Sequence, residues 1–432
     1  MARRVDAGAY ADRALAGEAR RAGLDPRDRA QAMRLAYGVV QRRRTLDWLI
    51  DDALERSAAL EPALRDVLRL GAYELAFSDA VPERAAVDQA VRLARGLGGP
   101  ARRANARAGL ANAVLRRLAR EAPGRLRELE AAGGDDPATL ALLHSVPDWV
   151  ATRLTAALGA ADARGVLAAA NLPAETAVRW NPLRGPRIGL ERELPAGARR
   201  DPLIPEAYVM DGAFALEDSA AWAHGLVMGQ SRASMLAARA LDARPRERVL
   251  DLCAAPGAKA THLAALTRNG AEIVSVELRP ARAEALRALA RRLGARVTVI
   301  EGDARTVALH GPFDAALVDP PCTGLGVLAA RPDARWRRRE EAIGPLVELQ
   351  SALLERALAC VRPGGRVVYS VCTLLPEEGE EIVAGALAAG ARLDDLRPAL
   401  PEAAHPRLAG ALLTLPHRDR TDGFLVARLR PD

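Results

Sequence analysis

Apolar residues recur at helical spacing through the first third of the chain, without strand-like alternation. Residues 62–77 and 105–120 each carry a stripe of apolar positions three or four residues apart, which is typical of amphipathic helices that pack together. The stripes are Leu64, Leu68, Gly71 and Leu75 in the first stretch and Leu110, Val114 and Leu118 in the second. We therefore predict an all-α bundle over residues 1–135, which ends at a run of glycine and aspartate.

The pattern becomes mixed over residues 136–225. Short runs of extended character at 176–181 and 187–190 are separated by prolines. These residues predict a small α+β module that links two larger domains.

Apolar runs alternate with helical patterns from residue 226 to the end of the sequence. Most of these runs end in small or acidic residues, and the stretches between them have helical periodicity. The expected strands lie at 249–251, 273–277, 297–300, 315–319 and 367–370, the helices at 257–268, 280–293, 345–361 and 378–390, and two closing strands at 412–415 and 424–428. Repeated βα units predict an α/β, Rossmann-like domain over residues 226–432, with a mostly parallel sheet covered by helices on both faces.

Composition narrows the class of protein. The chain has 432 residues, of which 50% are hydrophobic, so several domains can pack. No apolar run approaches the roughly 20 residues that span a bilayer, and the first residues resemble no signal peptide. We expect a cytoplasmic protein without a membrane partner, and a monomer by default. The four cysteines form no C-x-x-C pair and the histidines do not cluster near them, so we predict no metal site and no disulfide framework.

The basic residues carry a second signal. They outnumber the acidic residues by 62 to 55, and a single one of them, Lys259, is lysine. The arginine bias is typical of a GC-rich genome. A lysine retained against this background indicates a position that needs a compact ammonium rather than a guanidinium fork.

Lys259 lies in a loop of small residues that follows the first strand of the α/β domain, Asp251-Leu-Cys-Ala-Ala-Pro-Gly-Ala-Lys259. Such a loop lets the backbone approach a nucleotide. Glu277 ends the second strand 20 residues after Gly257, a spacing that suits a carboxylate accepting hydrogen bonds from ribose hydroxyls. Asp303, after the third strand, is placed to meet an adenine amino group. Ligands of this fold bind at these strand ends.

The loop lacks both common phosphate-binding motifs, G-x-G-x-x-G and G-x-x-x-x-G-K-[ST]. It also offers little room or charge for a pyrophosphate. S-adenosyl-L-methionine carries adenine and ribose without phosphate, so we predict this molecule as the cofactor.

Two cysteines stand at neighbouring strand ends, one in Asp319-Pro-Pro-Cys322 and the other at Cys372. Carbon 5 of a pyrimidine is a poor nucleophile, but a thiolate that adds at carbon 6 enables carbon 5 to attack a sulfonium methyl. A neighbouring carboxylic acid stabilises the charge that develops at N3. The combination predicts methylation of cytosine at carbon 5, and spacing alone leaves open which thiol attacks.

The motifs together resemble a known family. They are Leu250-Asp-Leu-Cys-Ala-Ala-Pro-Gly-Ala-Lys259, Val318-Asp-Pro-Pro-Cys-Thr-Gly-Leu-Gly326, Tyr369-Ser-Val-Cys-Thr-Leu-Leu-Pro-Glu-Glu378 and Asp422-Gly-Phe424. This set resembles the RsmB (Sun/Fmu) ribosomal RNA cytosine-C5 methyltransferases of bacteria. The helical runs Leu70-Gly-Ala-Tyr-Glu-Leu75 and Asn112-Ala-Val-Leu-Arg-Arg117 resemble the NusB RNA-binding fold that precedes the catalytic part in that family.

The resemblance implies a role for each site residue. Cys372 is the expected nucleophile, Cys322 is expected to help break the covalent adduct, and Asp319 is expected to hold the cytosine ring. The implied cofactor contacts are Cys253, Ala254, Ala255, Pro256, Gly257, Ala258, Lys259, Glu277, Asp303 and Asp319. Ala258 departs from the glycine that the family usually has there, which predicts a stiffer loop.

The implied substrate is RNA, with small-subunit (16S) ribosomal RNA as the expected target. Arginines of the helical domain should hold its backbone, and the module around Arg179 should add contacts. The arginines in question are Arg102, Arg103, Arg107, Arg116 and Arg117. The acidic run at 377–381 is interpreted as a helix start matched to the helix dipole. Two alternatives stay open, namely an RNA-binding or antitermination-type factor with an inactive methyltransferase scaffold, and the same chemistry on another RNA.

Overall fold

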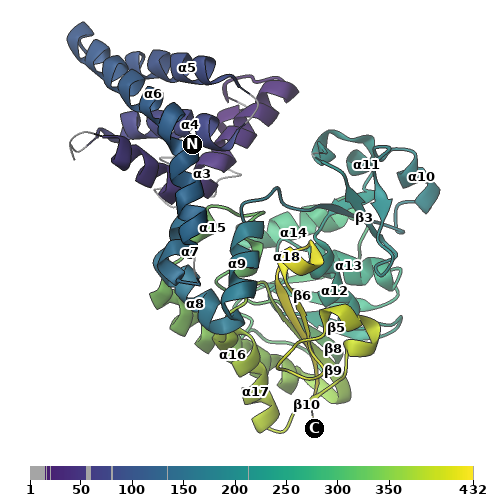
Figure 1. Cartoon of the computed structure of the whole chain (residues 1–432). Coiled ribbons are helices and arrows are strands. Elements are labelled where there is room, and N and C mark those ends of the chain that lie inside the picture. The colour runs from purple at the N-terminus through teal and green to yellow at the C-terminus, as the bar shows by residue number, and fades with distance from the viewer. Residues whose placement is uncertain are drawn as a thin grey trace. The chain divides into compact units, whose positions relative to one another are not determined.

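The computed structural model describes residues 15–431 with the exception of residues 16, 20, 55–59, 79–80, 134 and 213. The described residues form two compact units (Figure 1). Unit 1 contains the described residues up to Leu172 together with Leu328–Arg338, and unit 2 contains Pro173–Val327 and the described residues from Arg339 onward. The predicted module over 136–225 is therefore divided between the two units, because the helices that follow residue 135 contact the preceding helices.

Unit 1 is helical in its described part, which agrees with the all-α prediction as far as residue 135, whereas the helices over residues 137–169 lie in the stretch predicted as an α+β module. Prolines occupy the first turn of three of its helices, where their missing N–H costs no hydrogen bond. Fully buried leucines such as Leu68 and Leu115 form its core. The helices are α3 (Pro26–Ala53), α4 (Pro62–Phe77), α5 (Glu83–Arg95), α6 (Ala101–Ala132), α7 (Pro137–Leu143), α8 (Asp148–Leu158), α9 (Ala160–Ala169) and α15 (Ala334–Arg337).

The buried face of α6 differs from the predicted stripe. Leu110 is 37% exposed, whereas Ala108 and Ala111 are buried. Small residues on this face let α6 pack closely against α4 and α5. Arg107 is also buried, and its guanidinium donates a hydrogen bond of 2.7 Å to the Glu61 carboxylate. The prediction that Arg107 is free to hold RNA is therefore wrong.

A second buried guanidinium explains why residues 328–338 group with unit 1. Arg335 is fully buried and donates to the carbonyls of Gln41 (2.9 Å) and Ala170 (2.9 Å) and to the side-chain oxygen of Asn171 (3.0 Å). Burial lowers the pKa of this guanidinium to about 9. The hydrogen bonds tie α15 to α3 and α9.

Unit 2 begins with a four-stranded antiparallel sheet of order β2-β3-β1-β4. The strand predicted near 176–181 is confirmed, but the run at 187–190 is helical rather than extended. Pro186 precedes this single helical turn, and proline is well suited to a helix start. The elements are β1 (Thr176–Trp180), β2 (Arg199–Arg200), β3 (Ala207–Met210) and β4 (Val227–Gly229), with α10 (Arg187–Glu191) and α11 (Ala220–Ala223).

The second sheet of unit 2 has the order β10-β12-β9-β8-β5-β6-β7, with β11 paired to β12. Strands β5 to β9 pair in parallel and β10 to β12 pair antiparallel, which confirms the mostly parallel Rossmann-like sheet. Its strands are β5 (Arg248–Asp251), β6 (Glu272–Glu277), β7 (Thr298–Glu301), β8 (Phe313–Val318), β9 (Val361–Val371), β10 (Arg392–Leu393), β11 (Leu412–Thr414) and β12 (Phe424–Arg430).

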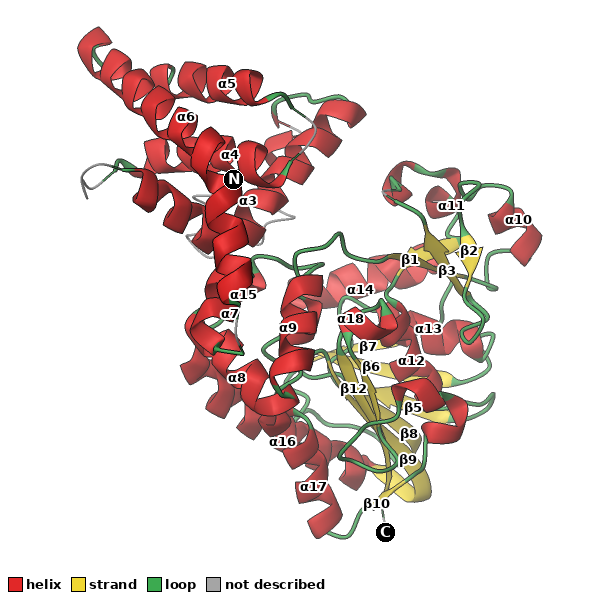
Figure 2. Cartoon of the chain, viewed as in Figure 1, coloured by secondary structure: helices red, strands yellow, loops and turns green. Residues whose placement is uncertain are grey.

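Helices cover both faces of this sheet. In Figure 2, α12 and α13 lie on one side of the strands and α16 and α17 on the other. The helices are α12 (Arg232–Ala240), α13 (Ala258–Leu266), α14 (Pro280–Leu293), α16 (Ile343–Cys360), α17 (Glu380–Ala388) and α18 (Pro416–Asp419). The layered arrangement buries the central strands and leaves their ends for polar residues.

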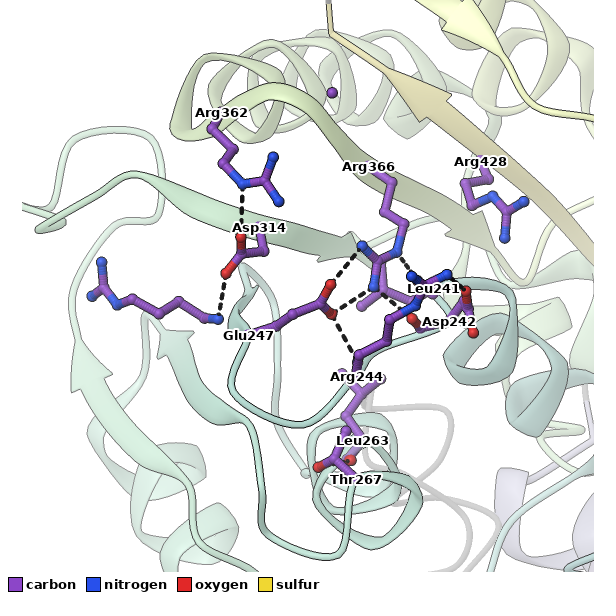
Figure 3. A network of polar contacts seen from close by, with 12 residues as sticks. Leu241, Asp242, Arg244, Glu247, Leu263, Thr267, Asp314, Arg362, Arg366 and Arg428 are labelled. Atoms are coloured by element: carbon purple, nitrogen blue, oxygen red, sulfur yellow. Dashed lines mark hydrogen bonds and ion pairs between the residues drawn. The ribbon is translucent and has the colours of Figure 1, made fainter.

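Paired charges occupy the amino ends of the parallel strands (Figure 3). The guanidinium of Arg366 donates to both carboxylate oxygens of Glu247, at 3.0 and 2.6 Å, and to the carbonyls of Leu241 and Asp242. Only 8% of Arg366 is exposed, so this pair is largely removed from solvent. It fastens β9 to the connection between α12 and β5.

Candidate active site

The small-residue loop joins the end of β5 to the start of α13. The N–H of Ala254 donates to the carbonyl of Val276, which holds the loop against β6. Gly257 has a φ of +107°, and a Cβ there would lie 2.2 Å from Cδ1 of Leu286. Glycine is therefore required at this turn. Ala258 begins α13, a helical position that accepts a side chain, so its departure from the family pattern introduces no strained φ.

Asp251, the last residue of β5, is 1% exposed. Neither of its carboxylate oxygens has a well-formed hydrogen bond to the residues that the structure describes. Burial, with help from the charge of Asp319, raises the pKa of this carboxyl to about 7. A buried acceptor without a donor suits a ligand that brings hydroxyl or ammonium groups, and S-adenosyl-L-methionine carries both.

The two predicted ribose and adenine contacts differ in their surroundings. Glu277 ends β6, is 5% exposed and accepts a 3.0 Å hydrogen bond from the N–H of Arg279. Asp303 follows β7, and the Arg305 side chain engages both of its oxygens. These hydrogen bonds lower the pKa of Asp303 to about 2. A ligand at Asp303 would have to compete with Arg305.

Lys259 projects from the first turn of α13 to the carboxyl end of β8. Its Nζ lies 2.6 Å from Oδ2 of Asp319 and 5.2 Å from the ring centre of Phe424. Burial lowers the pKa of this ammonium, but the charge and hydrogen bond of Asp319 outweigh burial and raise the pKa above its ordinary value. The contact explains the lone lysine, because a compact cation fills the space between a carboxylate and an aromatic face.

The two candidate thiols meet at the ends of β8 and β9. The Sγ atoms of Cys322 and Cys372 are 3.3 Å apart, and Cys322 is the more buried of the two. The hydrogen bond to Cys372 and then desolvation raise the pKa of Cys322 well above its ordinary value. Either thiol can donate in this contact, and the raised pKa favours the neutral form of Cys322.

The backbone around Cys372 is held by two glycines. The N–H of Gly326 donates to the carbonyl of Cys372 at 3.0 Å, and the N–H of Gly423 donates to the carbonyl of Gly326 at 2.8 Å. A Cβ on Gly326 would lie 2.0 Å from the Gly423 carbonyl oxygen, so the close approach requires glycine.

Several residues around the site were not assigned a role from the sequence. Asp251 and Phe424 belong to the motifs at 250–259 and 422–424, but their contacts depend on the tertiary fold. Arg179, expected near RNA, is fully buried and donates to the carbonyl of Ala258 at 2.7 Å. The prediction of an RNA contact at Arg179 is wrong, because strand β1 packs this side chain behind the loop. Burial raises the pKa of the Cys253 thiol, which is typical of a packing residue.

Two further findings concern the described part of the chain. Within the residues searched, His, Cys, Asp and Glu side chains form no group of three or more that could hold a metal ion. None of the described helices is both long enough and apolar enough to cross a bilayer.

The fold and the site together define an S-adenosyl-L-methionine-dependent methyltransferase. They combine a Rossmann-like sheet, a nucleotide-binding loop without a phosphate-binding motif, and reactive side chains at the same strand ends. Residues 238–430 match the family model described as 16S rRNA methyltransferase RsmB/F, and residues 2–120 match the NusB family. The chain belongs to the RsmB/F family of ribosomal RNA methyltransferases.

Individual relatives support this assignment over nearly the whole length. The chain is 38% identical to ribosomal RNA small subunit methyltransferase B of Thermus thermophilus, over 99% of this chain and 94% of the relative. It is 32% identical to a probable ribosomal RNA small subunit methyltransferase B of Synechocystis, over 98% and 95%. The crystal structure of PH0851 superposes with a TM-score of 0.77 at 26% identity and covers 94% of this chain and 91% of that one.

Proposed function

We propose that the protein methylates carbon 5 of a cytosine in small-subunit ribosomal RNA through a covalent bond between Cys372 and the base. The observation that carries the proposal is the 3.3 Å approach of two thiols at the strand ends that also hold Lys259 and Asp319. Methyl transfer to an amino group or a hydroxyl needs no thiol, whereas activation of a pyrimidine carbon does.

The residues that would hold the cofactor line the ends of β5 and β6. Asp251 and Glu277 offer buried carboxylates, and the turn at Gly257 lets the backbone approach a ligand. When bound, S-adenosyl-L-methionine supplies an electrophilic methyl group on a sulfonium. The proposed contacts are Cys253, Ala254, Ala255, Pro256, Gly257, Ala258, Lys259, Glu277, Asp303 and Asp319.

Cys372 is the proposed nucleophile. Its sulfur is partly exposed, whereas that of Cys322 is buried. The charge of Cys372 is one of the causes that raise the pKa of Lys259. The Cys372 thiolate adds to carbon 6 of the cytosine, and the electron pair of the 5,6 double bond makes carbon 5 nucleophilic. Asp319, as the protonated acid, donates a hydrogen bond to N3 while negative charge develops there.

Cys322 is proposed to assist release of the product. Once the Cys372 sulfur is bonded to carbon, the hydrogen-bonded thiol pair is broken, so the main cause of the raised pKa of Cys322 is lost. Cys322 can then give its proton to solvent and accept the proton that leaves carbon 5. The electrons of that C–H bond restore the 5,6 double bond as the bond between sulfur and carbon 6 breaks.

Replacement of Cys372 by serine tests the proposal. With labelled S-adenosyl-L-methionine and 16S rRNA, C372S should lose at least about 10³-fold in methyl transfer, because an alcohol is a far weaker nucleophile than a thiolate. C360S is the matched control at the end of α16 and should retain activity. Bisulfite sequencing of the wild-type product should locate the methyl group on a cytosine carbon. Wild-type turnover by C372S would contradict the covalent role.

A further inference from the structure

A buried carboxylate, that of Glu378, connects the loop that contains Cys322 with the loop that contains Cys372. Glu378 is fully buried, and its carboxylate accepts hydrogen bonds from neutral donors. One oxygen accepts from the N–H of Thr323 (2.8 Å) and from Nε2 of Gln350 (2.9 Å). The other oxygen accepts from the Thr373 hydroxyl (2.9 Å) and from the Thr323 hydroxyl. The acidic run 377–381 does precede and begin a helix, with Glu380 and Glu381 in the first turn of α17, but Glu378 lies before that helix and is buried.

The partners of Glu378 are the residues that follow the two thiols. Thr323 comes directly after Cys322, and Thr373 comes directly after Cys372. Their hydroxyls also lie 2.7 Å from each other. Gln350 extends the contact, because its Nε2 lies 2.9 Å from the carbonyl of Pro321 in the same loop as Cys322. One carboxylate therefore fixes the distance between the two loops.

A buried carboxylate at this position costs folding free energy. Burial of an ionised group without a cationic partner is unfavourable unless its hydrogen bonds are satisfied. An apolar side chain could fill the same volume without that cost, but it could not orient two threonines in the loops that follow β8 and β9. The four hydrogen bonds thus indicate a requirement for geometry rather than for packing alone.

We propose that Glu378 is a positioning residue that holds Cys322 and Cys372 at the separation needed for one thiol to take over from the other. The role rests on the proposed function, since it serves the passage from adduct formation by Cys372 to release assisted by Cys322. Glu378 itself contacts neither base nor cofactor and acts through Thr323 and Thr373.

Disulfide trapping measures this separation without any methylation assay. Diamide oxidises two nearby thiols to a disulfide and is itself reduced to the hydrazine. In the full chain, peptide mapping should show rapid linkage of Cys322 to Cys372. In E378A we expect the linkage rate to fall at least about tenfold and kcat about a hundredfold, as for reacting groups displaced by about 1 Å. The KM for RNA and the Kd for S-adenosyl-L-methionine should change less than about threefold, because binding surfaces stay in place.

Two further variants separate positioning from general destabilisation. E378Q should restore most of the linkage rate, because its amide oxygen can accept from Thr323 and Gln350 while its nitrogen donates to the hydroxyls. E381A removes an exposed acid from the same run and should match the wild type. Wild-type linkage and kcat in folded E378A would overturn the proposal.

If E378A fails to fold, T373V decides the question, since it removes the hydroxyl that binds Glu378 and Thr323 at nearly constant shape. An unchanged linkage rate and kcat in T373V would then overturn the role of Glu378. If C372S proves fully active, the covalent mechanism fails, yet the linkage rates still report whether Glu378 sets the distance between the thiols.

Discussion

The two ends of the parallel strands in unit 2 treat buried charge differently. At the amino ends, Arg366 satisfies both oxygens of Glu247, and Arg362 and a backbone N–H satisfy Asp314 (Figure 3). At the carboxyl ends, Asp251 is buried without a well-formed hydrogen bond among the described residues, and two thiols face each other.

The difference separates polar groups that build the fold from polar groups that await a ligand. A charge paired inside the protein contributes to a fixed geometry, whereas an unsatisfied buried acceptor costs stability unless a ligand supplies a donor. Substitutions at the carboxyl ends should accordingly change activity, and substitutions at the amino ends should change stability.

The largest effect should come from Asp319 at the carboxyl end. D319N keeps the shape but loses the charge that holds Lys259 and the acidic proton that, as we propose, supports N3 of the cytosine. We expect kcat to fall about 10²- to 10⁴-fold, the range for a lost acid–base group. The amide oxygen can still accept from Lys259, so the free energy of unfolding should fall by less than about 3 kcal/mol. D314N at the amino end is the matched control and should keep its kcat. Equal losses of activity in both variants would remove the distinction between the two ends.

Substitution of Arg366 should have the opposite consequence, with a large loss of stability and little loss of kcat. R366M leaves the Glu247 carboxylate buried without its cation, so we expect the free energy of unfolding to fall by about 3–5 kcal/mol in urea denaturation. R362M breaks a half-exposed pair with Asp314 and should cost no more than about 1 kcal/mol. The folded fraction of R366M should methylate RNA at the wild-type rate. A stable R366M would show that the buried pair contributes little to the fold.

These effects also show what sequence patterns can predict. The alternation of apolar runs located the strand ends, and therefore Asp319, Cys322 and Cys372, because parallel strands end at a common edge. It could not identify Glu378, since an acidic run before a helix has the same local pattern whether it is exposed or buried. The donors to Glu378 come from positions 323, 350 and 373, and only the tertiary fold brings them together.

Arginines were the other source of error. Arg107 and Arg179 were expected on RNA-facing surfaces, but both are buried and donate to nearby acceptors. In a chain where nearly every basic residue is arginine, charge alone does not distinguish a surface contact from a buried guanidinium. The lone lysine was informative for the opposite reason, because its type is rare.

Lys259 provides a smaller test of the carboxyl end. K259R keeps the positive charge but places a planar fork where a compact ammonium lies between Asp319 and Phe424. Loss of one charge-assisted hydrogen bond, about 1.5–3 kcal/mol, should lower kcat/KM about ten- to a hundredfold. R248K is the matched exchange at the amino end and should leave kcat/KM unchanged. Wild-type kcat/KM in K259R would show that any cation suffices.

The smallest effect concerns pH. The pKa of Asp251 is raised to about 7 by burial, so the folded state retains a proton that the unfolded state releases near pH 4. The contribution of this group to stability is therefore full at low pH and declines as the pH rises from about 4 to about 7. D251N should lack this decline in urea denaturation between pH 5 and 8.

Cofactor affinity should change in the opposite direction. Donors on S-adenosyl-L-methionine favour the ionised carboxylate of Asp251, so calorimetry should show affinity rising a few-fold as the pH passes about 7. The rise should be absent in D251N. A pH-independent affinity in the wild type would indicate that Asp251 does not contact the cofactor.

The covalent bond itself is the most direct test of the account. We would incubate C322A with 16S rRNA and S-adenosyl-L-methionine, digest the RNA and protein, and identify any cross-linked peptide by mass spectrometry. We expect a nucleotide attached to the sulfur of Cys372, with a methyl group on carbon 5 of the base, because without Cys322 the methylated RNA is not released from the enzyme. Methylated RNA released without an adduct, or a nucleotide attached to any other residue, would contradict it.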